Sequence, residues 1–234
     1  MQRKGFYQLT LAAVLAGCIG APTVFAGDET KEITERLNTA ATVLNEVMSA
    51  PDKGIPEELL SKAQCVAVVP GLKKGAFIIG GEYGRGFMSC RKAGGWSGPA
   101  SIRMEGGSVG FQIGASETDV VLLVMNDQGQ SRLLSTQFTI GAEGEVAAGP
   151  VGRHTTAQTD AALTAEILSW SRSRGVFAGI SLKGATLRQD LKSNGKIYGR
   201  EISNKEIVDT MMPAPAAAAN FSKSLAMYSP HEKH

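Results

Sequence analysis

The sequence predicts an α+β fold: a single domain with an antiparallel-rich, Gly-rich sheet and helices near the N- and C-terminal ends. Three observations predict it. Apolar residues recur at helical spacing in 28–49, short apolar runs alternate with turn residues from 65 to 148, and a helix-starting pattern stands at 203–206. The 28 glycines fall between the apolar runs rather than in a repeat, which indicates tight turns and bulges in a closely packed sheet.

The first element is an amphipathic helix at 28–49. Its apolar positions are separated by three or four residues: Ile33, Leu37, Ala41, Leu44 and Met48. The opposite face is net acidic, so we expect the apolar face to pack onto the sheet. The helix ends at Ala50-Pro51, because the residue before a proline disfavours helix. A short second helix starts at Pro56 and runs to about residue 63.

Short strands should follow. The expected strands are 65–69, 76–83, 86–91, 96–104, 108–115, 120–126, 137–140 and 145–148, with a turn at Ala93-Gly94-Gly95. The run 120–125 is continuously apolar and should be central in the sheet. A short helix is expected at 127–135.

The C-terminal part predicts a hairpin and two further helices. The segments 161–171 and 176–182 should pair as strands through a turn at Arg174-Gly175. Asn194-Gly195 is typical of a turn. Ser203 and Glu206 form a capping box, so a helix should begin there and carry Ile207, Val208 and Met211. The segment 216–228 is either a terminal helix or a loose tail. We therefore place one domain at 28–212, followed by a Pro/Ala-rich tail or helix at 213–234.

Residues 1–26 have the pattern of an export signal. Arg3 and Lys4 precede an apolar run at 9–16, which is too short to span a bilayer. Val24-Phe25-Ala26 fits ordinary signal cleavage, whereas Leu15-Ala16-Gly17-Cys18 resembles a lipobox in which Cys18 receives the lipid. Both routes predict an exported protein, either periplasmic or lipid-anchored to the outer membrane.

The charge of the mature chain is balanced. The whole chain has 24 basic and 22 acidic residues, and the signal contains two of the basic ones, which leaves 22 of each. This balance argues against a general nucleic-acid-binding protein. Basic residues are concentrated in 61–105 and 161–205, and acidic residues in 27–60 and 106–160. The basic blocks either form one positive face or interleave with the acidic ones and cancel.

Two cysteines remain in the mature domain beside Cys18. Cys65 and Cys90 are an even pair, which in an oxidising compartment can form a disulfide. Two buried, reduced thiols are the alternative, and the sequence does not decide between them.

The sequence predicts no catalytic site, metal site or cofactor. The residues 106–110 match G-x-S-x-G around Ser108, and an Asp and His154 follow in hydrolase order. However, that motif requires a sharp turn between a strand and a helix, and Ser108 leads into an apparent strand. The three histidines show no metal-ligand spacing. We therefore expect a binding protein rather than an enzyme.

The strand region resembles the SYLF-domain family. The similarity rests on ordered blocks across 28–212, among them 73–77, 80–91, 96–100, 107–114, 118–122, 146–153 and 171–182. The resemblance implies binding to acidic phospholipids, as in eukaryotic members. It also implies an exported protein of the bacterial cell envelope, where the actin role of some eukaryotic members is not expected.

The resemblance also implies a candidate site. Family lipid binding uses basic residues, and the matching positions are Lys73, Lys74, Arg172 and Arg174. We expect these four to converge on one face and bind an anionic phospholipid or membrane surface. The alternative function is a structural or protein-interaction domain of the envelope without lipid specificity. The sequence names no protein partner.

Overall fold

The computed structural model describes residues 25–50, 54–93, 95–150, 165–173, 176–179 and 182–228, so most of the predicted signal lies outside it. Its helices are α1 (Phe25–Ser49), α2 (Glu57–Lys62), α3 (Asp127–Leu133), α5 (Leu191–Tyr198), α6 (Asn204–Asp209) and α7 (Ala219–Tyr228), with a short 3₁₀ helix at Ala216–Ala218. Its strands are β1 (Cys65–Lys92), β2 (Gly95–Trp96), β3 (Ala100–Val124), β4 (Gln137–Thr139), β5 (Val146–Ala148), β6 (Ile167–Ser173), β7 (Val176–Gly179) and β8 (Thr186–Gln189). The predicted α+β fold is confirmed.

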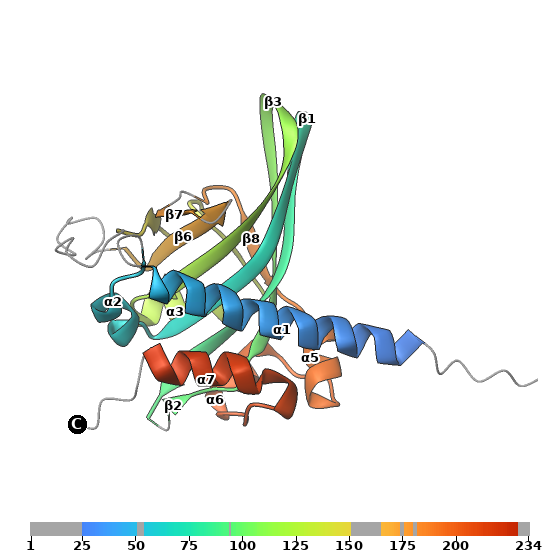
Figure 1. The fold of residues 1–234 in the computed structure, drawn as a ribbon, viewed down its shortest axis with the longest axis vertical. Helices are drawn as coiled ribbons and strands as arrows, with labels where there is room; N and C mark the ends of the chain where they lie inside the picture. Colours follow the sequence, from blue (N-terminus) through green and yellow to red (C-terminus); the bar gives the residue numbers. More distant parts are fainter. Residues whose placement is uncertain are drawn as a thin grey trace, which may run out of the picture.

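Helix α1 confirms the amphipathic pattern. All five predicted apolar positions of this helix are buried. They share one core cluster with Val66 and Val68 of β1 and with Phe221 and Leu225 of α7. Figure 1 shows α1 lying across the sheet with α7 beside it. The apolar face of α1 is therefore used inside the domain, as its acidic outer face led us to expect.

The prediction of several short strands between 65 and 126 was wrong. One long strand, β1, replaces the first three, and β3 replaces most of the next three. These two strands pair antiparallel from Cys65 opposite Val124 to Met88 opposite Ala100. The expected break at Pro70-Gly71 is a register shift, with Gly71 at a φ of 60°. Glycine and proline mark bulges as well as turns, and the sequence pattern does not distinguish the two.

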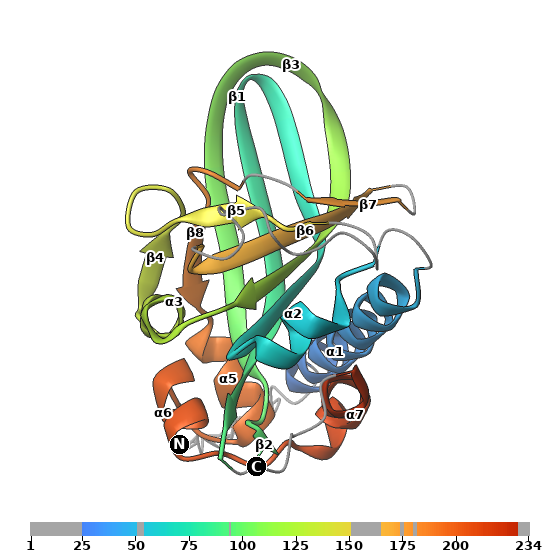
Figure 2. The same cartoon turned by 90° about the vertical axis from the view of Figure 1, so that its left-hand side faces the viewer.

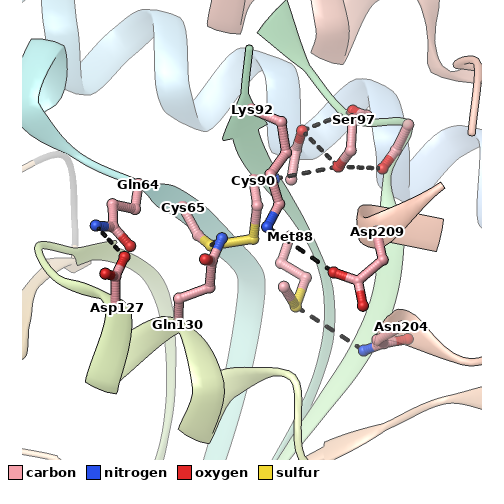
Figure 3. Close-up of a disulfide and its surroundings, with 12 residues drawn as sticks. Gln64, Cys65, Met88, Cys90, Lys92, Ser97, Asp127, Gln130, Asn204 and Asp209 are labelled. Atoms are coloured by element: carbon pink, nitrogen blue, oxygen red, sulfur yellow. Dashed lines mark hydrogen bonds and ion pairs between the residues drawn. A yellow bond between two sulfur atoms is a disulfide. The ribbon is translucent and has the colours of Figure 1, made fainter. Parts of the chain in front are cut away.

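The β1–β3 ribbon arches back on itself (Figure 2). The two arms of β1 come so close that a Cβ on Gly86 would lie 2.0 Å from the carbonyl oxygen of Val68. Cys65 and Cys90, at the two ends of the arch, are fully buried and joined by a disulfide (Figure 3). Of the two alternatives left open by the sequence, the structure has the disulfide.

The arch organises the rest of the sheet. Its order is β2-β1-β3-β6-β5, with β7 on the outer side of β6 and β8 between β3 and β4. The strands that the structure describes pair antiparallel, except that β5 pairs parallel with β6. The run 120–124 is fully buried and lies between β1 and β6, which confirms the predicted central strand. The predicted hairpin is present as β6 and β7.

Two hydrophobic clusters fill the domain. One lies between the helices α1, α2 and α7 and one face of β1, β3 and β6. The other lies inside the arch and includes Leu72, Met88, Ile102, Leu122 and Phe138. The alternation of β1 side chains serves both clusters, since Val66 and Val68 face the helices while Ala67 and Val69 face the inside of the arch.

The C-terminal part contains two elements that the sequence did not predict, β8 and α5. Asn194-Gly195 is not a turn but lies inside α5. Asn194 is fully buried there, where its side-chain oxygen accepts from the Ser101 backbone N–H at 2.7 Å and its amide donates to Asn204 at 2.7 Å. These tertiary bonds outweigh the local turn preference.

The last helices follow the sequence closely. Ser203 caps α6, as predicted, by accepting a hydrogen bond from the Glu206 N–H at 3.1 Å. Ile207 and Val208 are buried in α6, whereas Met211 lies beyond its end with a φ of 48°. The segment 216–228 is helical and packs on α1, so the helix alternative holds for it.

Candidate binding surfaces

The bend of the β1–β3 ribbon projects from the domain, and the outermost part of this bend, at 76–79 of β1 and 109–113 of β3, is here called the end of the ribbon. β3 pairs with β8 through 102–105 and with β6 through 119–124. Between these positions, β3 pairs only with β1 among the strands that the structure describes, and the register of this pairing shifts between Ala76 and Ile78. Figures 1 and 2 both show this two-stranded arch extending beyond the helices and the other strands. A projection of this kind is available to contact a large partner.

The sequence at the end of the ribbon is apolar. It reads Ala-Phe-Ile-Ile at 76–79 in β1, and its β3 part contains Val109, Phe111 and Ile113. Glycines separate these residues from the charged positions on each side. Residue types of this kind at the end of a protruding ribbon are typical of a segment that contacts another apolar phase.

The two predicted lysines lie where the ribbon leaves the domain. Lys73 is exposed and stands opposite Glu117 in the β1–β3 register. Lys74 is partly exposed, and its ammonium lies 2.9 Å from Glu82 on the returning arm of β1. Lys74 therefore links the two arms of the arch, while Lys73 makes no ion pair with any described residue.

The structure places Arg172 in a different setting. Its guanidinium binds Asp119 at 2.6 Å and also pairs with Glu46 of α1. Asp119 accepts a further hydrogen bond at 2.9 Å from the N–H of Gly71, two residues before the lysines. Arg172 is therefore connected to the base of the ribbon but is held by carboxylates, and burial lowers the pKa of its guanidinium. Arg174 lies outside the described residues. The lipid-binding role of the four residues stays a prediction.

Most other basic residues also have carboxylate partners. The pairs include Lys62 with Glu58, Arg132 with Glu166, Arg103 and Arg188 with Glu105, Lys92 and Lys205 with Asp209, and Arg200 with Glu206. In the described ranges the two basic blocks thus interleave with acidic residues, which was one of the two alternatives for the charge pattern.

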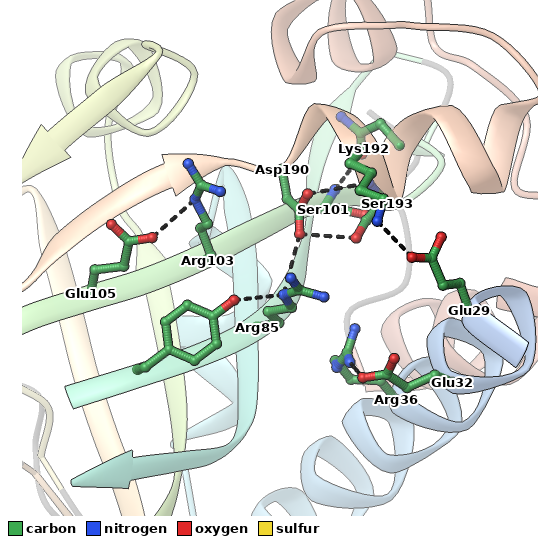
Figure 4. Close-up of polar contacts among 12 residues, drawn as sticks. Glu29, Glu32, Arg36, Arg85, Ser101, Arg103, Glu105, Asp190, Lys192 and Ser193 are labelled. Carbon is green, nitrogen blue, oxygen red and sulfur yellow. Dashed lines mark hydrogen bonds and ion pairs between the residues drawn. The ribbon is translucent and has the colours of Figure 1, made fainter. Parts of the chain in front are cut away.

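A second candidate surface was missed by sequence reasoning. Arg85 of β1 and Lys192 and Lys196 of α5 line a small pocket with Glu29 of α1 (Figure 4). The i, i+4 spacing of the two lysines was the available signal, since it places them on one face of a helix. That signal was lost because Asn194-Gly195 between them was interpreted as a turn.

The remaining sequence predictions concern the Ser108 motif, the lipidation site Cys18 and the absence of a metal site. Ser108 lies within β3 opposite Gly80, not at a junction between a strand and a helix. His154 and Cys18 lie outside the described residues. No helix in the described ranges is long and apolar enough to cross a membrane. No group of three or more His, Cys, Asp or Glu residues there could hold a metal ion.

Comparison with known proteins identifies the family. A family model described as "Ysc84: Las17-binding protein actin regulator" matches residues 105–228, more than half of the chain. The SH3 domain-containing YSC84-like protein 1 of Rattus norvegicus is 32% identical over 179 residues, which cover 76% of this chain and 52% of the rat protein. Protein YSC84 of Saccharomyces cerevisiae is 34% identical over 179 residues, covering 74% of this chain and 38% of the yeast protein. The chain thus spans about half or less of these relatives. It belongs to the Ysc84 family of SYLF-domain proteins.

Proposed function

We propose that this domain binds anionic phospholipid surfaces without catalysing a reaction, and that the projecting end of the β1–β3 ribbon is the part that meets the membrane. The observation that carries the proposal is the ribbon itself. It is two strands wide, it extends away from the domain, and its apolar end lies beyond Lys73 and Lys74.

The ribbon combines the two contributions that a peripheral membrane protein needs. Apolar residues at its end gain free energy by leaving water, about 25 cal/mol per Å² of apolar surface. A lysine near an anionic surface adds roughly 1 kcal/mol, and its long stem lets the ammonium reach the headgroups. Because Lys74 is already paired with Glu82, Lys73 has the more available charge. The charge of these two lysines is therefore too weak to hold the domain at a membrane, and binding also requires the apolar end of the ribbon.

Arg172 has a supporting part in this proposal. It joins β6, β3 and α1 through Asp119 and Glu46, next to the place where the ribbon leaves the sheet. A fixed base keeps the ribbon projecting. We thus assign the direct membrane contact to Lys73, with Lys74 beside it, and the anchoring of the base to Arg172.

The position of Ser108 supports a role without catalysis. A hydrolase nucleophile needs a strained turn that exposes its hydroxyl next to a helix N-terminus. Ser108 is instead one residue in the middle of a 25-residue strand. Export and anchoring through Cys18 belong to the same proposal, because a lipidated Cys18 would keep the domain at a membrane surface of the cell envelope.

Cosedimentation of the purified protein with lipid vesicles tests this function. We expect binding to phosphatidylglycerol vesicles, weak binding to phosphatidylcholine vesicles, and less binding as salt increases. Phe111→Asp should abolish binding and Lys73→Ala should weaken it several-fold. Lys183→Ala is the matched control, because Lys183 is also exposed and makes no ion pair with described residues. Equal binding to both kinds of vesicle at low salt would contradict the electrostatic part.

The second candidate is a structural or protein-interaction domain of the envelope. The extensive pairing of basic with acidic side chains favours it, because such pairs leave few charges free for a lipid surface. Under this alternative neither kind of vesicle binds, and Phe111→Asp changes nothing in the cosedimentation assay.

A further inference from the structure

A polar pocket of about 100 Å³ lies between α1, β1 and α5. Its walls are Glu29, Glu32 and Ile33 from α1, Arg85 from β1, and Lys192, Ser193 and Lys196 from α5. It is remote from the projecting ribbon, because α5 and the end of the ribbon lie at opposite ends of the molecule in both views (Figures 1 and 2). The membrane surface proposed above therefore does not account for it.

The two lysines of α5 already bind an oxyanion, the carboxylate of Glu29. Lys192 Nζ lies 2.5 Å from Glu29 Oε1, and Lys196 Nζ lies 3.3 Å from Glu29 Oε2. Each carboxylate oxygen thus has its own ammonium group. The hydrogen bond from Lys192 and then that from Lys196 lower the pKa of Glu29, so its carboxylate is ionised at neutral pH.

Arg85 contributes a third cation with unused donors. Its Nε donates to Tyr83 Oη at 2.7 Å and lies 3.7 Å from Asp190 Oδ2. Asp190 is buried and accepts from the backbone N–H and the hydroxyl of Ser193 at 3.2 and 2.9 Å, which fixes its position. The two terminal nitrogens of Arg85 make no hydrogen bond with any described residue. Figure 4 shows them on the side that faces α1.

We propose that this pocket is a binding site for a phosphate monoester group, and that Glu29 occupies it until such a group displaces it. A phosphate monoester has nearly two negative charges at neutral pH and three acceptor oxygens. It can accept from Lys192, Lys196 and the fork of Arg85 together, whereas the single carboxylate of Glu29 contacts only the two lysines.

Displacement of Glu29 couples the pocket to α1. Glu29 lies near the N-terminal end of that helix, and its bonds to Lys192 and Lys196 tie this end to α5. Glu32 does not replace it, because it is paired with Arg36 at 2.5 Å. A bound phosphate group should therefore release the start of α1 from α5. The carboxylate of Glu29 thus blocks the pocket until an anion with more negative charge displaces it.

Calorimetric titration with glycerol 3-phosphate tests the site in the purified protein. Glu29→Gln removes the competing carboxylate and should tighten binding about tenfold, whereas the double variant Lys192→Ala/Lys196→Ala should weaken it at least tenfold. Glu58→Gln and Lys62→Ala are the matched controls, because that i, i+4 pair on α2 has the same chemistry outside the pocket. Both should bind as the wild type does. Thermal unfolding of each variant verifies that it is folded.

Vesicles that contain phosphatidate distinguish the two sources of the phosphate group. If Glu29→Gln raises the affinity for both glycerol 3-phosphate and phosphatidate vesicles, the pocket takes a lipid headgroup. If it raises only the affinity for glycerol 3-phosphate, the pocket takes a soluble phosphate ester. The proposal fails if Glu29→Gln binds glycerol 3-phosphate no more tightly than the wild type, or if the double lysine variant binds it equally well. Neither failure affects the membrane proposal, because Lys73 and Phe111 lie outside the pocket.

Discussion

Gly86 allows the two arms of β1 to meet, because it has no side chain. A Cβ at this position would lie 2.0 Å from the carbonyl oxygen of Val68 and 2.7 Å from the Cα of Val69, both backbone atoms that cannot rotate away. We predict that Gly86→Ala lowers the free energy of unfolding by about 3 kcal/mol, at the upper end of the cost of overpacking. Urea denaturation measures it. Gly75→Ala is the control, because nothing lies within 4 Å of its Cβ position, and it should change stability by less than about 0.5 kcal/mol.

Asn194 is a second residue with an effect beyond its own helix. Its side chain satisfies the backbone N–H of Ser101 and the side chain of Asn204, all of them buried. Asn194→Ala leaves these groups without partners, and each unsatisfied buried group costs about 1–3 kcal/mol. We expect a loss of at least about 2 kcal/mol in the free energy of unfolding. Asn220→Ala removes a single exposed bond to Asn38, so a similar loss in that control would contradict the account.

At the scale of the element, the disulfide closes the β1 arch. Cys65 and Cys90 are 25 residues apart, and a cross-link over a loop of that length stabilises a domain by about 3 kcal/mol through the unfolded state. The double variant Cys65→Ala/Cys90→Ala should lose about that amount in urea denaturation. Added reductant should destabilise the wild type but leave the variant unchanged. Equal sensitivity of both proteins to reductant would show that the bond does not provide this stability.

The elements also show which parts of the fold can be predicted from the sequence. Helix α1 was predicted because burial of one face imposes a clear period on it, and the central run 120–124 was predicted because burial of both faces makes it continuously apolar. The continuity of β1 was not, because Pro70-Gly71 has the same composition whether the chain turns or bulges. Helix α5 was missed because Asn194 is held by Ser101 and Asn204, which are distant in sequence.

The candidate sites also differ in how far the sequence predicts them. Lys73 and Lys74 were identified through the family resemblance, and in the β1–β3 register they lie opposite Glu117 and Ser116, before the end of the ribbon. The pocket between α1, β1 and α5 depends on Glu29, Arg85 and Lys192, which come together only in the folded chain. Within one segment, only the i, i+4 spacing of Lys192 and Lys196 indicates a part of it.

At the scale of the whole molecule, ion pairs spread over the surface make stability depend on pH. Lysine partners lower the pKa of Glu29, Glu58 and Asp209 below the ordinary values of 4.5 for Glu and 3.8 for Asp. A carboxylate with a lowered pKa stabilises the fold above its unfolded pKa, and this contribution disappears as the pH falls through its folded pKa. We therefore expect a lower urea midpoint at pH 3 than at pH 6. In the triple variant Glu29→Gln/Glu58→Gln/Asp209→Asn the urea midpoint should fall slightly less between pH 6 and pH 3. The difference from the wild type should be small, because ion pairs between exposed groups contribute little to stability. An identical drop in the variant would exclude these pairs as the cause.

The most direct test of the central claim is whether the end of the ribbon enters a membrane. Phe111→Trp places a fluorescent probe there. The native tryptophans serve as internal controls, because Trp170 is fully buried and Trp96 lies in β2, at the opposite end of the molecule from the end of the ribbon (Figure 2). With phosphatidylglycerol vesicles that contain a brominated phospholipid, we predict strong quenching of the variant and little quenching of the wild type. A variant that sediments with the vesicles while its added tryptophan stays unquenched would contradict the claim that the ribbon meets the membrane.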